Sequence, residues 1–522
     1  MSVFWLVLGA VGLALGYSLQ TARWLRVLQR EHYEPASMFR FWRRWTFPSL
    51  RYVTVARLRR YRPLTLSYLL WCTFPAALVV AVVGHSVVTF VVDAVVYGVA
   101  CPWGLSPRGR TGRLQWTRRA RTVAEVALLV SVLVVAIGVP LHEKLLFAAL
   151  AVWIVPFTLA AAARLVMPWE SRLAATYVAQ ASQRLARVRP TVVAITGSFG
   201  KTSTKNHLAD LLRADGGVVA TPKSFNNRAG LSRSINENLA DDTRVFIAEM
   251  GTYGPGEIRD LCAWCAPEIA VITAIGPVHL ERMKSLDVIE AAKFEITERA
   301  RTVVVNVDDP RLALWPARLS QRVRTAGSES ADADVRVVPQ DGRWHVWVDG
   351  EDVAQVEPVL GVQPTNVACA VAAALEVGAL TSELTRRLES VQPVANRATV
   401  ATAASGVVVV DDTFNANPAS ARASLEVLSA LSLSGRRVVI TPGLIELGVE
   451  QSDRNEELAR EIARRGMELA IVGRTNVAAL STGFGEDARR FAVRDEAVAW
   501  VRESLGPGDA VLYLNDLPDQ YP

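Results

Sequence analysis

Two hydrophobic patterns divide this chain. Up to about residue 168, long apolar segments alternate with arginine-rich ones, whereas from about residue 175 short Val/Ile-rich runs alternate with helical stretches of ten or more residues. The long segments predict membrane-spanning helices. The short runs predict buried, mostly parallel strands with helices on both faces of the sheet. We therefore expect a helical membrane region followed by α/β structure.

Five apolar segments make up the predicted membrane region, residues 1–168. They are Val3–Leu19, Leu64–Val83, Val87–Cys101, Val126–Leu141 and Leu145–Val166. Val87–Cys101 is short and carries Asp93, so a return span and one half of a re-entrant hairpin both stay open. Asp93 is either functional in the membrane, or it lies near an interface or pairs with an arginine.

Basic residues are concentrated between these segments. Residues 1–168 contain 19 Lys and Arg but only five Asp and Glu, and the surplus lies in Arg23–Arg62 and Arg108–Arg121. The positive-inside rule places both loops, and all that follows Pro168, in the cytoplasm. The surplus fits anionic lipid and does not indicate nucleic acid. We expect a multi-pass protein of the cell membrane, with the bilayer and other membrane proteins as candidate partners.

Five cysteines among 522 residues predict no disulfide framework. Cys262 and Cys265 form a C-x-x-C motif that lacks a second pair. Metal or redox chemistry and two small buried helix residues are therefore alternative interpretations.

Beyond residue 168 the pattern predicts two α/β domains, residues 169–395 and 396–522. Strands are expected at Val192–Ile195, Val245–Ala248, Ala270–Ile275 and Thr302–Asn306, then at Val407–Val410, Arg437–Ile440, Leu469–Val472 and Ala510–Leu514. The spacing of apolar residues changes over residues 335–358, and Asp349-Gly350 is typical of a tight turn. This segment therefore predicts a small antiparallel excursion.

The segment Thr191–Lys205 reads as a strand, a glycine-containing loop and a helix start. Backbone N–H groups around Gly197–Lys201 are expected to cradle nucleotide phosphates at the positive end of the helix dipole. Lys201 would reach the terminal phosphates, and Thr202 would hold Mg²⁺. The general motif has a glycine where Ile195 stands, so the loop alone is an incomplete signal.

Further polar motifs follow the predicted strands, at the edge where open α/β sheets build their sites. In chain order they are Asn226-Asn227-x-x-Gly230, Glu249-Met-Gly251, Pro255-Gly-Glu-Ile258, His279, Lys293, Asp411-Asp412-x-Phe414-Asn415-Ala-Asn417-Pro418 and Glu446-Leu-Gly448. Each alone has an ordinary explanation, such as a helix cap or a turn. Together they resemble the Mur ligase family, ATP-dependent amide ligases of cell-wall synthesis, over residues 190–475. The pattern is most similar to the branch that adds D-alanyl-D-alanine.

This resemblance implies a P-loop central ATPase domain and a Rossmann-like C-terminal domain. It implies that ATP activates a carboxylate as an acyl phosphate, which an amine then attacks. Thr202 and Glu249 match the ligands of one Mg²⁺, and His279 matches the ligand of a second. Lys293 matches a lysine that the family carbamylates, and a carbamate would place an anion beside the metals.

The resemblance also assigns nucleotide and substrate contacts. The implied ATP-binding residues are Gly197, Ser198, Gly200, Lys201, Thr202, Ser203, Asn306, Asp308, Asn366, Asp412 and Asn415. Arg397 matches an arginine near the γ-phosphate, and it joins Lys201, His279 and Lys293 as an implied catalytic residue. Asn226 and Asn227 are expected to contact the substrate.

Two departures from the family concern substrate recognition. The UDP-binding N-terminal domain has no counterpart, and the C-terminus lacks the Lys-Gly-Ser-Arg stretch. We therefore expect a membrane-anchored carboxylate–amine ligase that acts on an amino-acid or peptide substrate, which a membrane lipid would carry. The alternatives are a poly-γ-glutamate-type synthase and, from another class, a transporter or scaffold with a regulatory ATPase domain.

Overall fold

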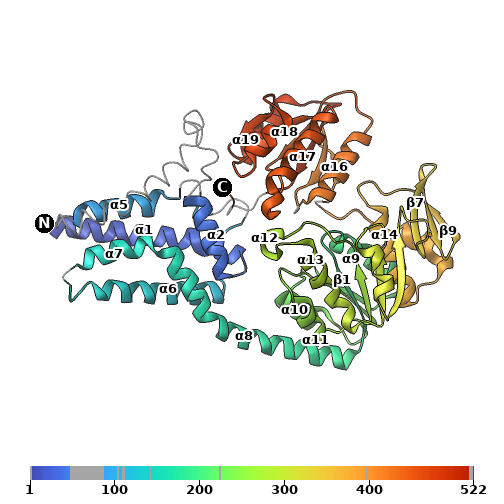
Figure 1. Ribbon diagram of the computed structural model, residues 1–522, viewed down its shortest axis with the longest axis horizontal. Helices are drawn as coiled ribbons and strands as arrows, with labels where there is room; N and C mark the ends of the chain where they lie inside the picture. The colour runs from blue at the N-terminus through green and yellow to red at the C-terminus, as the bar shows by residue number, and fades with distance from the viewer. Residues whose placement is uncertain are drawn as a thin grey trace. The chain divides into compact units, whose positions relative to one another are not determined.

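The computed structural model describes residues 3–46, 87–102, 105–108, 112–141, 143–222, 225–395, 397–414, 416–516 and 521. The chain forms two compact units, residues 1–173 with 517–522, and residues 174–516 (Figure 1). The expected span Leu64–Val83 lies outside the described residues. The expected domain border at residue 168 falls inside a continuous helix, α8.

The first unit is helical. Its described helices are α1 (Val3–Arg30), α2 (Pro35–Thr46), α5 (Val87–Ala100), α6 (Arg118–Ile137), α7 (Lys144–Trp153) and the start of α8 (Val155–Val188). The expected segment Leu145–Val166 is broken, because α7 and α8 meet at a 74° bend. Pro156 stands in the first turn of α8, where its ring and missing N–H prevent α7 from continuing.

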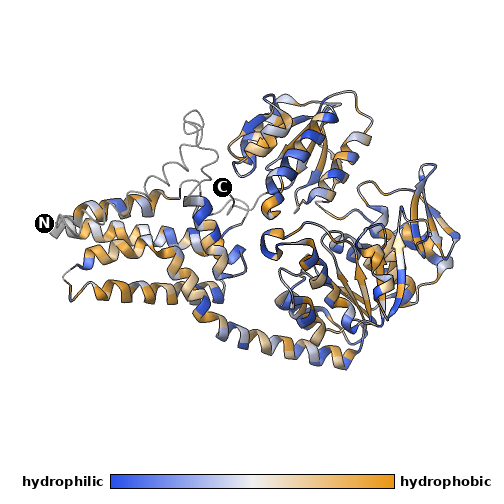
Figure 2. Cartoon of the chain, viewed as in Figure 1, coloured by the Kyte–Doolittle hydropathy of each residue, from blue (hydrophilic) through white to orange (hydrophobic). Residues whose placement is uncertain are grey.

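One described helix, α6, is long and apolar enough to cross a membrane. The bent pair α7 and α8 would add a second span if both helices count as one. Figure 2 shows the hydrophobic residues along these helices. The five-span arrangement stays a prediction.

Small residues bring α1 and α5 into close contact. Gly12 and Gly16 form a small-xxx-small pair on α1, and Gly16 faces Gly98 of α5 so closely that a Cβ on Gly98 would lie 2.6 Å from the Gly16 Cα. Beyond this contact, Arg23 donates to the carbonyls of Gly98 at 2.8 Å and Cys101 at 3.0 Å. A side chain of α1 thus satisfies carbonyls that the end of α5 leaves open.

The second unit contains a nine-stranded sheet in the order β2-β3-β1-β4-β5-β6-β7-β8-β9. Its strands are β1 (Thr191–Thr196), β2 (Val218–Ala220), β3 (Val245–Glu249), β4 (Ile269–Ile272), β5 (Thr302–Asn306), β6 (Arg322–Gly327), β7 (Val335–Gln340), β8 (Arg343–Val348) and β9 (Glu351–Val356). The pairs are parallel up to β7, and β7–β8–β9 is the expected antiparallel excursion, which extends this same sheet.

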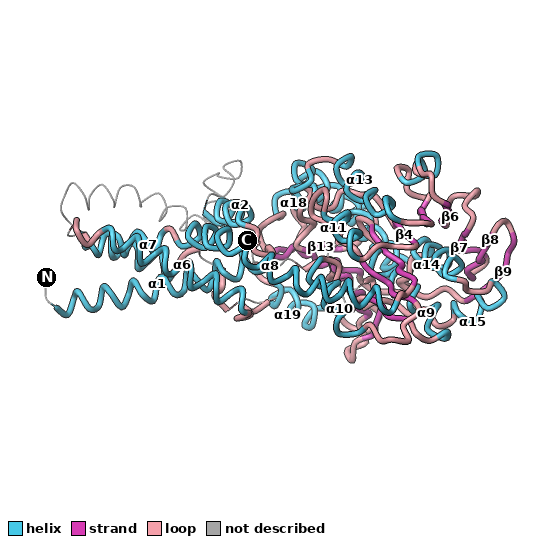
Figure 3. Tube along the Cα trace, turned by 90° about the horizontal axis from the view of Figure 1, so that it is seen from below, coloured by secondary structure: helices cyan, strands magenta, loops and turns pink. Residues whose placement is uncertain are grey.

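Alternating residues of β1 pack into two cores, one on each face of the sheet. Val193 and Ile195 join helices α9 (Lys201–Leu212), α14 (Pro364–Val377) and α15 (Leu384–Leu388). Val192 and Ala194 join α10 (Arg228–Asn238), α11 (Glu257–Trp264), α13 (Leu286–Phe294) and the end of α8. Figure 3 shows strands between flanking helices. The central position of β1 places the loop after it among the carboxyl ends of β3 and β4.

A second sheet follows in the order β10-β11-β15-β12-β13-β14, parallel except for the β10–β11 pair. Its strands are β10 (Thr399–Thr402), β11 (Val408–Asp412), β12 (Arg437–Thr441), β13 (Glu468–Val472), β14 (Arg489–Phe491) and β15 (Ala510–Leu514). Helices α16 (Pro418–Ala430), α17 (Gln451–Arg464) and α18 (Val477–Phe484) cover one face, and α19 (Arg494–Ser504) covers the other. We call residues 397–516 the C-terminal block.

The glycine contact between α1 and α5 predicts that Gly98→Ala destabilises the helical unit. The added methyl group has backbone as its neighbour, so the helices must separate, at a cost of roughly 1–3 kcal/mol. Thermal unfolding of the full chain in detergent would show a lower Tm. Gly9→Ala is the matched control, because its Cβ would meet only a side-chain methyl of Val91, at an ordinary 3.6 Å. Equal Tm values for the two variants would contradict this packing.

Candidate active site

The loop after β1 depends on two glycines. Gly197 has φ of 156° and Gly200 has φ of 83°, conformations that side chains rarely adopt. A Cβ on Gly197 would lie 2.0 Å from Thr273 Oγ1, and one on Gly200 would lie 2.5 Å from Asn366 Oδ1. Ile195, where the general motif has glycine, is instead a buried residue of β1. The loop therefore begins only at Gly197.

Lys201 and Ser198 hold this loop in shape. Lys201 Nζ donates to the Gly197 carbonyl at 2.7 Å. Ser198 Oγ donates to the Gly276 carbonyl at 3.0 Å and accepts from the Gly276 N–H at 2.9 Å. Burial lowers the pKa of Lys201, nearby Glu249 raises it and Arg397 lowers it further. The loop thus keeps its ammonium beside the N-terminus of α9, where anions are stabilised.

Glu249, at the end of β3, is the buried carboxylate of the site. Its Oε2 accepts from Thr202 Oγ1 at 2.9 Å and pairs with Lys205 Nζ at 3.2 Å. Its Oε1 accepts from Asn226 Nδ2 at 3.2 Å. The Thr202 hydroxyl and the Glu249 carboxylate are adjacent hard oxygen donors, so this donor set fits Mg²⁺.

The two asparagines of the substrate prediction differ in what they contact. Asn226 bonds Glu249, whereas Asn227 caps α10 by accepting from the Gly230 N–H at 2.9 Å. Both have structural partners in this state, and their contact with substrate stays a prediction.

Lys293 lies near the end of α13 with 4% of its surface exposed. Burial lowers its pKa well below the ordinary lysine value, and the Lys201 charge lowers it further. Among the residues that the structure describes, no carboxylate pairs with it. A lowered pKa favours the neutral amine, and the neutral form is the nucleophile that carbamylation by CO₂ requires.

His279 stands at the start of the short helix α12 (Leu280–Met283). Its Nδ1 pairs with Glu446 Oε2 of the C-terminal block, and its ring contacts the Tyr253 ring at 4.7 Å. Within the described residues no group of three or more His, Cys, Asp or Glu side chains is arranged to hold a metal. The role of His279 as a metal ligand stays a prediction.

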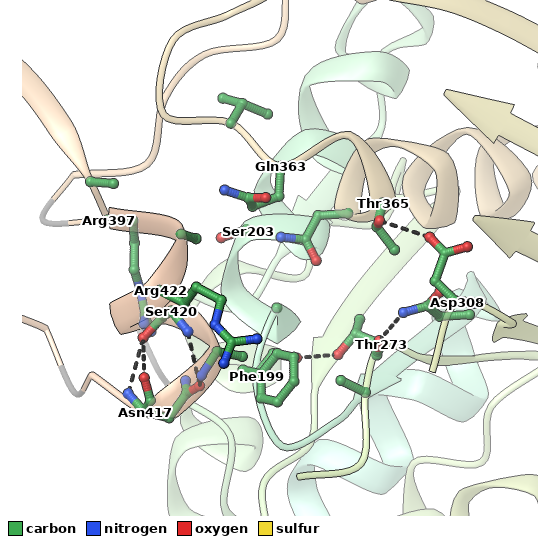
Figure 4. Close-up of a pocket in the computed structure, with 18 of the residues that line it drawn as sticks. Phe199, Ser203, Thr273, Asp308, Gln363, Thr365, Arg397, Asn417, Ser420 and Arg422 are labelled. Atoms are coloured by element: carbon green, nitrogen blue, oxygen red, sulfur yellow. Dashed lines mark hydrogen bonds between the residues drawn. The ribbon is translucent and has the colours of Figure 1, made fainter. Parts of the chain in front are cut away.

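A cavity of about 630 Å³ lies between the loop after β1 and the C-terminal block (Figure 4). Of the predicted nucleotide contacts, it is lined by Gly200, Thr202, Ser203, Asn306, Asp308, Asn366, Asp412 and also by Arg397. A smaller hollow beside it is lined by Ser198, Lys201, Arg397 and Glu446 among others. Asn415 lies outside the described residues.

The C-terminal block contributes an arginine and an acid to the cavity. Arg397 stacks over the Phe414 ring at 4.7 Å, and burial lowers its pKa while Asp412 and Glu249 raise it. Asp412 accepts from Ser424 Oγ at 2.7 Å, and burial raises its pKa. Both side chains therefore line the same cavity as the predicted nucleotide contacts.

Asn306 and Asp308 organise the far end of the cavity. Asn306 donates to the Thr273 carbonyl at 2.7 Å. Asp308 accepts from the backbone N–H groups of Ser328 and Ser330 and, at 3.0 Å, from the Thr365 hydroxyl. Asp308 thus ties two loops to the N-terminus of α14.

Three residues of interest lie outside the sequence prediction. Lys205 was detectable in principle, because it follows Lys201 by one helical turn and so lies on the same face. His207 lines the large cavity although it is only 1% exposed, and its Nδ1 has no hydrogen-bond partner in the described part of the chain. Phe199 lines both hollows. No motif marks these two positions.

Cys262 and Cys265 are buried at α11, and burial raises the pKa of the Cys262 thiol to about 12. Cys262 Sγ contacts Met250 Sδ at 3.7 Å. Such thiols stay protonated, so the geometry favours the packing interpretation over metal or redox chemistry.

Two family models match this chain. The Mur ligase middle domain matches residues 195–375, and the Mur ligase, glutamate ligase domain matches residues 396–514. The matches cover the two sheets and the cavity between them.

Curated proteins and solved structures agree with these matches. The UDP-N-acetylmuramoyl-tripeptide–D-alanyl-D-alanine ligase of Mycobacterium tuberculosis is 33% identical over 356 residues, which are 62% of this chain and 69% of that protein. The Bacillus subtilis enzyme with the same name is 25% identical over an alignment that covers 62% of this chain and 72% of that enzyme. The structure of MurF ligase from Thermotoga maritima in complex with ADP has 25% identity and a TM-score of 0.58, and covers 66% of this chain and 80% of that one.

The buried His207 predicts a pH dependence of stability. Burial lowers its pKa from 6.5 to about 4, so the folded protein keeps a neutral ring that the unfolded chain protonates. Stability present at pH 7 is therefore lost as the pH falls from 6.5 toward 4, by roughly 2–4 kcal/mol. Tm of the full chain, measured against pH, should fall less steeply in His207→Leu and in His207→Gln. A slope unchanged in both variants would contradict the assignment.

Proposed function

Because this chain belongs to the Mur ligase family, we propose that it is a membrane-anchored ligase that joins a carboxylate to an amine in cell-wall or cell-surface polymer synthesis. As a Mur ligase it is an ATP-dependent, ADP-forming enzyme that uses Mg²⁺. The observation that carries the proposal is the polar cluster around the buried Glu249 carboxylate, to which α9 contributes Thr202 and the buried Lys205, with Lys201 bonded to the loop after β1.

ATP supplies the phosphoryl group that activates the substrate carboxylate, and Mg²⁺ neutralises its charge. The chain's own residues position and stabilise these groups. Backbone N–H groups of residues 197–201 and the Lys201 ammonium would hold phosphate oxygens, and Thr202 with Glu249 would hold the metal. Arg397 and Asp412 approach from the C-terminal block, which covers the cavity and keeps water from the activated carboxylate.

We propose that Lys293 acts as its carbamate. A second cation beside Lys201 would leave this buried region with an excess of positive charge, whereas a carbamate supplies an anion that can orient metal or phosphate. The lowered pKa of its buried amine and the lack of a carboxylate partner in the described residues support this proposal.

Exposed apolar side chains support the proposed membrane anchor. On α6, the side chains of Leu129 and Leu133 are 58% and 57% exposed, and Ile137 is 57% exposed. Such a continuous apolar surface on a 20-residue helix is typical of contact with lipid. The amphipathic helix α2 adds Arg43 and Arg44 in its last turn, which suit an anionic membrane surface. A cytoplasmic position of the second unit follows from the positive-inside rule.

We propose a lipid-linked peptidoglycan precursor as the acceptor. Relatives of this chain are named for a UDP-linked muramoyl tripeptide. Here, the residues before β1 are helical wherever the structure describes secondary structure, and the family match begins only at residue 195. A substrate that the bilayer presents would need no nucleotide-sugar domain.

Loss of either catalytic lysine should abolish activity. Lys201→Ala and Lys293→Ala should each lower ADP release by the detergent-solubilised full chain at least about 100-fold, because both act on developing charge. Lys284→Ala is the control, since the one hydrogen bond of Lys284 Nζ within the described residues goes to an exposed backbone carbonyl, that of Glu281, at 2.6 Å. If Lys293 is carbamylated, Lys293→Arg is also inactive, and ¹³C-bicarbonate gives a carbamate NMR signal in the wild type alone. Amide product with both alanine variants would contradict the assignment of this site.

The substrate proposal predicts which acceptor triggers ADP release. The full chain should remain in membranes after an alkaline carbonate wash. It should release ADP with a lipid-linked peptidoglycan precursor plus an amino acid or dipeptide, and at least about tenfold less with the UDP-linked precursor. Release with glutamate alone would favour the polyglutamate synthase instead. No amide with any acceptor would favour the scaffold alternative.

A further inference from the structure

A loop of the C-terminal block crosses to His279. In this loop, which follows β12, the Glu446 carboxylate pairs with His279 Nδ1. The Glu446 carbonyl also accepts from the Glu281 N–H at 3.2 Å. Two residues later Gly448 lies beside the same helix start, where its Cβ would make van der Waals contact at 3.4 Å with the backbone of Leu280 and Glu281. The loop is therefore held to the start of α12 by its backbone as well as by its side chain.

Both partners of this contact have left-handed backbone conformations. His279 has φ of 59° and Glu446 has φ of 62°, although neither is glycine. Such conformations cost roughly 1–3 kcal/mol each, and they persist only where surrounding contacts hold them. Two of them at one contact indicate that the orientation of these side chains matters.

The His279 ring is held from two sides. Glu446 occupies Nδ1, and the Tyr253 ring meets the imidazole edge to face at 4.7 Å. Arg282 in turn stacks over the Tyr253 ring at 4.7 Å. No described residue bonds Nε2, so Nε2 is the ring nitrogen left to bind a ligand. A histidine bound to a metal commonly donates its other N–H to a carboxylate in this way, which sets the tautomer.

We propose that Glu446 is a positioning residue that acts through His279, holding Nδ1 as the N–H donor and presenting Nε2 to the metal. This inference rests on the proposed ligase function and on the metal-ligand role that the family resemblance implies for His279. Because Glu446 belongs to the C-terminal block, it also makes the metal site complete only when that block is docked. An ordinary surface ion pair would require neither the backbone contacts nor the two left-handed residues.

The test is Mn²⁺ binding to the full chain with a non-hydrolysable ATP analogue, followed by electron paramagnetic resonance. Loss of an orienting carboxylate typically weakens metal binding about 10–100-fold. We expect that loss for Glu446→Ala, and less than about a threefold change for Glu446→Gln, whose amide oxygen still accepts from Nδ1–H. Glu450→Gln is the matched control, because it lies on the same loop but pairs with Arg454 at 3.1 Å.

A second readout is the tautomer itself. With ¹⁵N-histidine labelling, only six ring systems contribute, and one signal should change tautomer in Glu446→Ala but not in Glu446→Gln. Wild-type Mn²⁺ affinity in Glu446→Ala would overturn the proposal. Equal losses of Mn²⁺ affinity in Glu446→Ala and Glu446→Gln would also overturn it. That outcome would mean that the charge of Glu446, and not the orientation of His279, supports metal binding.

The premise is tested separately. His279→Ala should weaken Mn²⁺ binding at least as much as Glu446→Ala, and an unchanged affinity would remove His279 from the metal site and overturn the inference with it. A failure of the proposed ligase function would appear differently, as wild-type protein that binds Mn²⁺ with the ATP analogue but makes no amide. Since Mn²⁺ affinity and the tautomer are measured without turnover, that failure would leave the role of Glu446 standing.

Discussion

The candidate active site is organised around the buried Glu249 carboxylate, which interacts with more than one lysine at once. Glu249 neutralises Lys205 directly, but it must also balance Lys201, whose pKa it raises against burial. Lys293 is left without a carboxylate partner in the described residues and shifts toward its neutral form. A buried region with excess positive charge is unfavourable on its own and becomes favourable when polyphosphate enters. The same imbalance explains why a lysine at this position would gain from becoming a carbamate.

The order of the strands brings these charged groups together. Because β1 lies between β3 and β4, the phosphate loop, Glu249 and the segment that begins at Thr273 all emerge at one edge of the sheet. The core beneath is close-packed from both faces, so the charged groups rest on a rigid base. The two strained glycines bring the loop backbone within contact of Thr273 and Asn366, which no larger residue would permit.

The sequence predicts the central strands and the motifs that follow them. It does not predict the short edge strands or the contacts that form only when the chain folds. The central strands were found because they are continuous apolar runs, and the catalytic motifs follow them directly. Short edge strands such as β2 and β14 have three residues each and carry no periodicity. His207 looks like an ordinary helix residue until α14 packs against α9. Asp308 looks like a ligand contact, yet most of its oxygen bonds go to backbone groups about 20 residues away. Such contacts depend on tertiary structure, which local pattern does not contain.

The residues of the candidate site come from the parts of the chain that carry the two sheets, and this bears on how the proposed reaction would proceed. Lys201, Glu249 and Lys293 belong to the part of the chain that carries the nine-stranded sheet. Arg397, Asp412 and Glu446 cannot reach the site unless the C-terminal block is docked. An activated carboxylate is hydrolysed if water reaches it before the amine does, so activation must wait for closure. A histidine held by a carboxylate from the second sheet would provide that dependence, since the metal site would be complete only in the closed state. The helical unit would then need only to deliver the acceptor, and the order of the chemical steps would be set within the two α/β sheets.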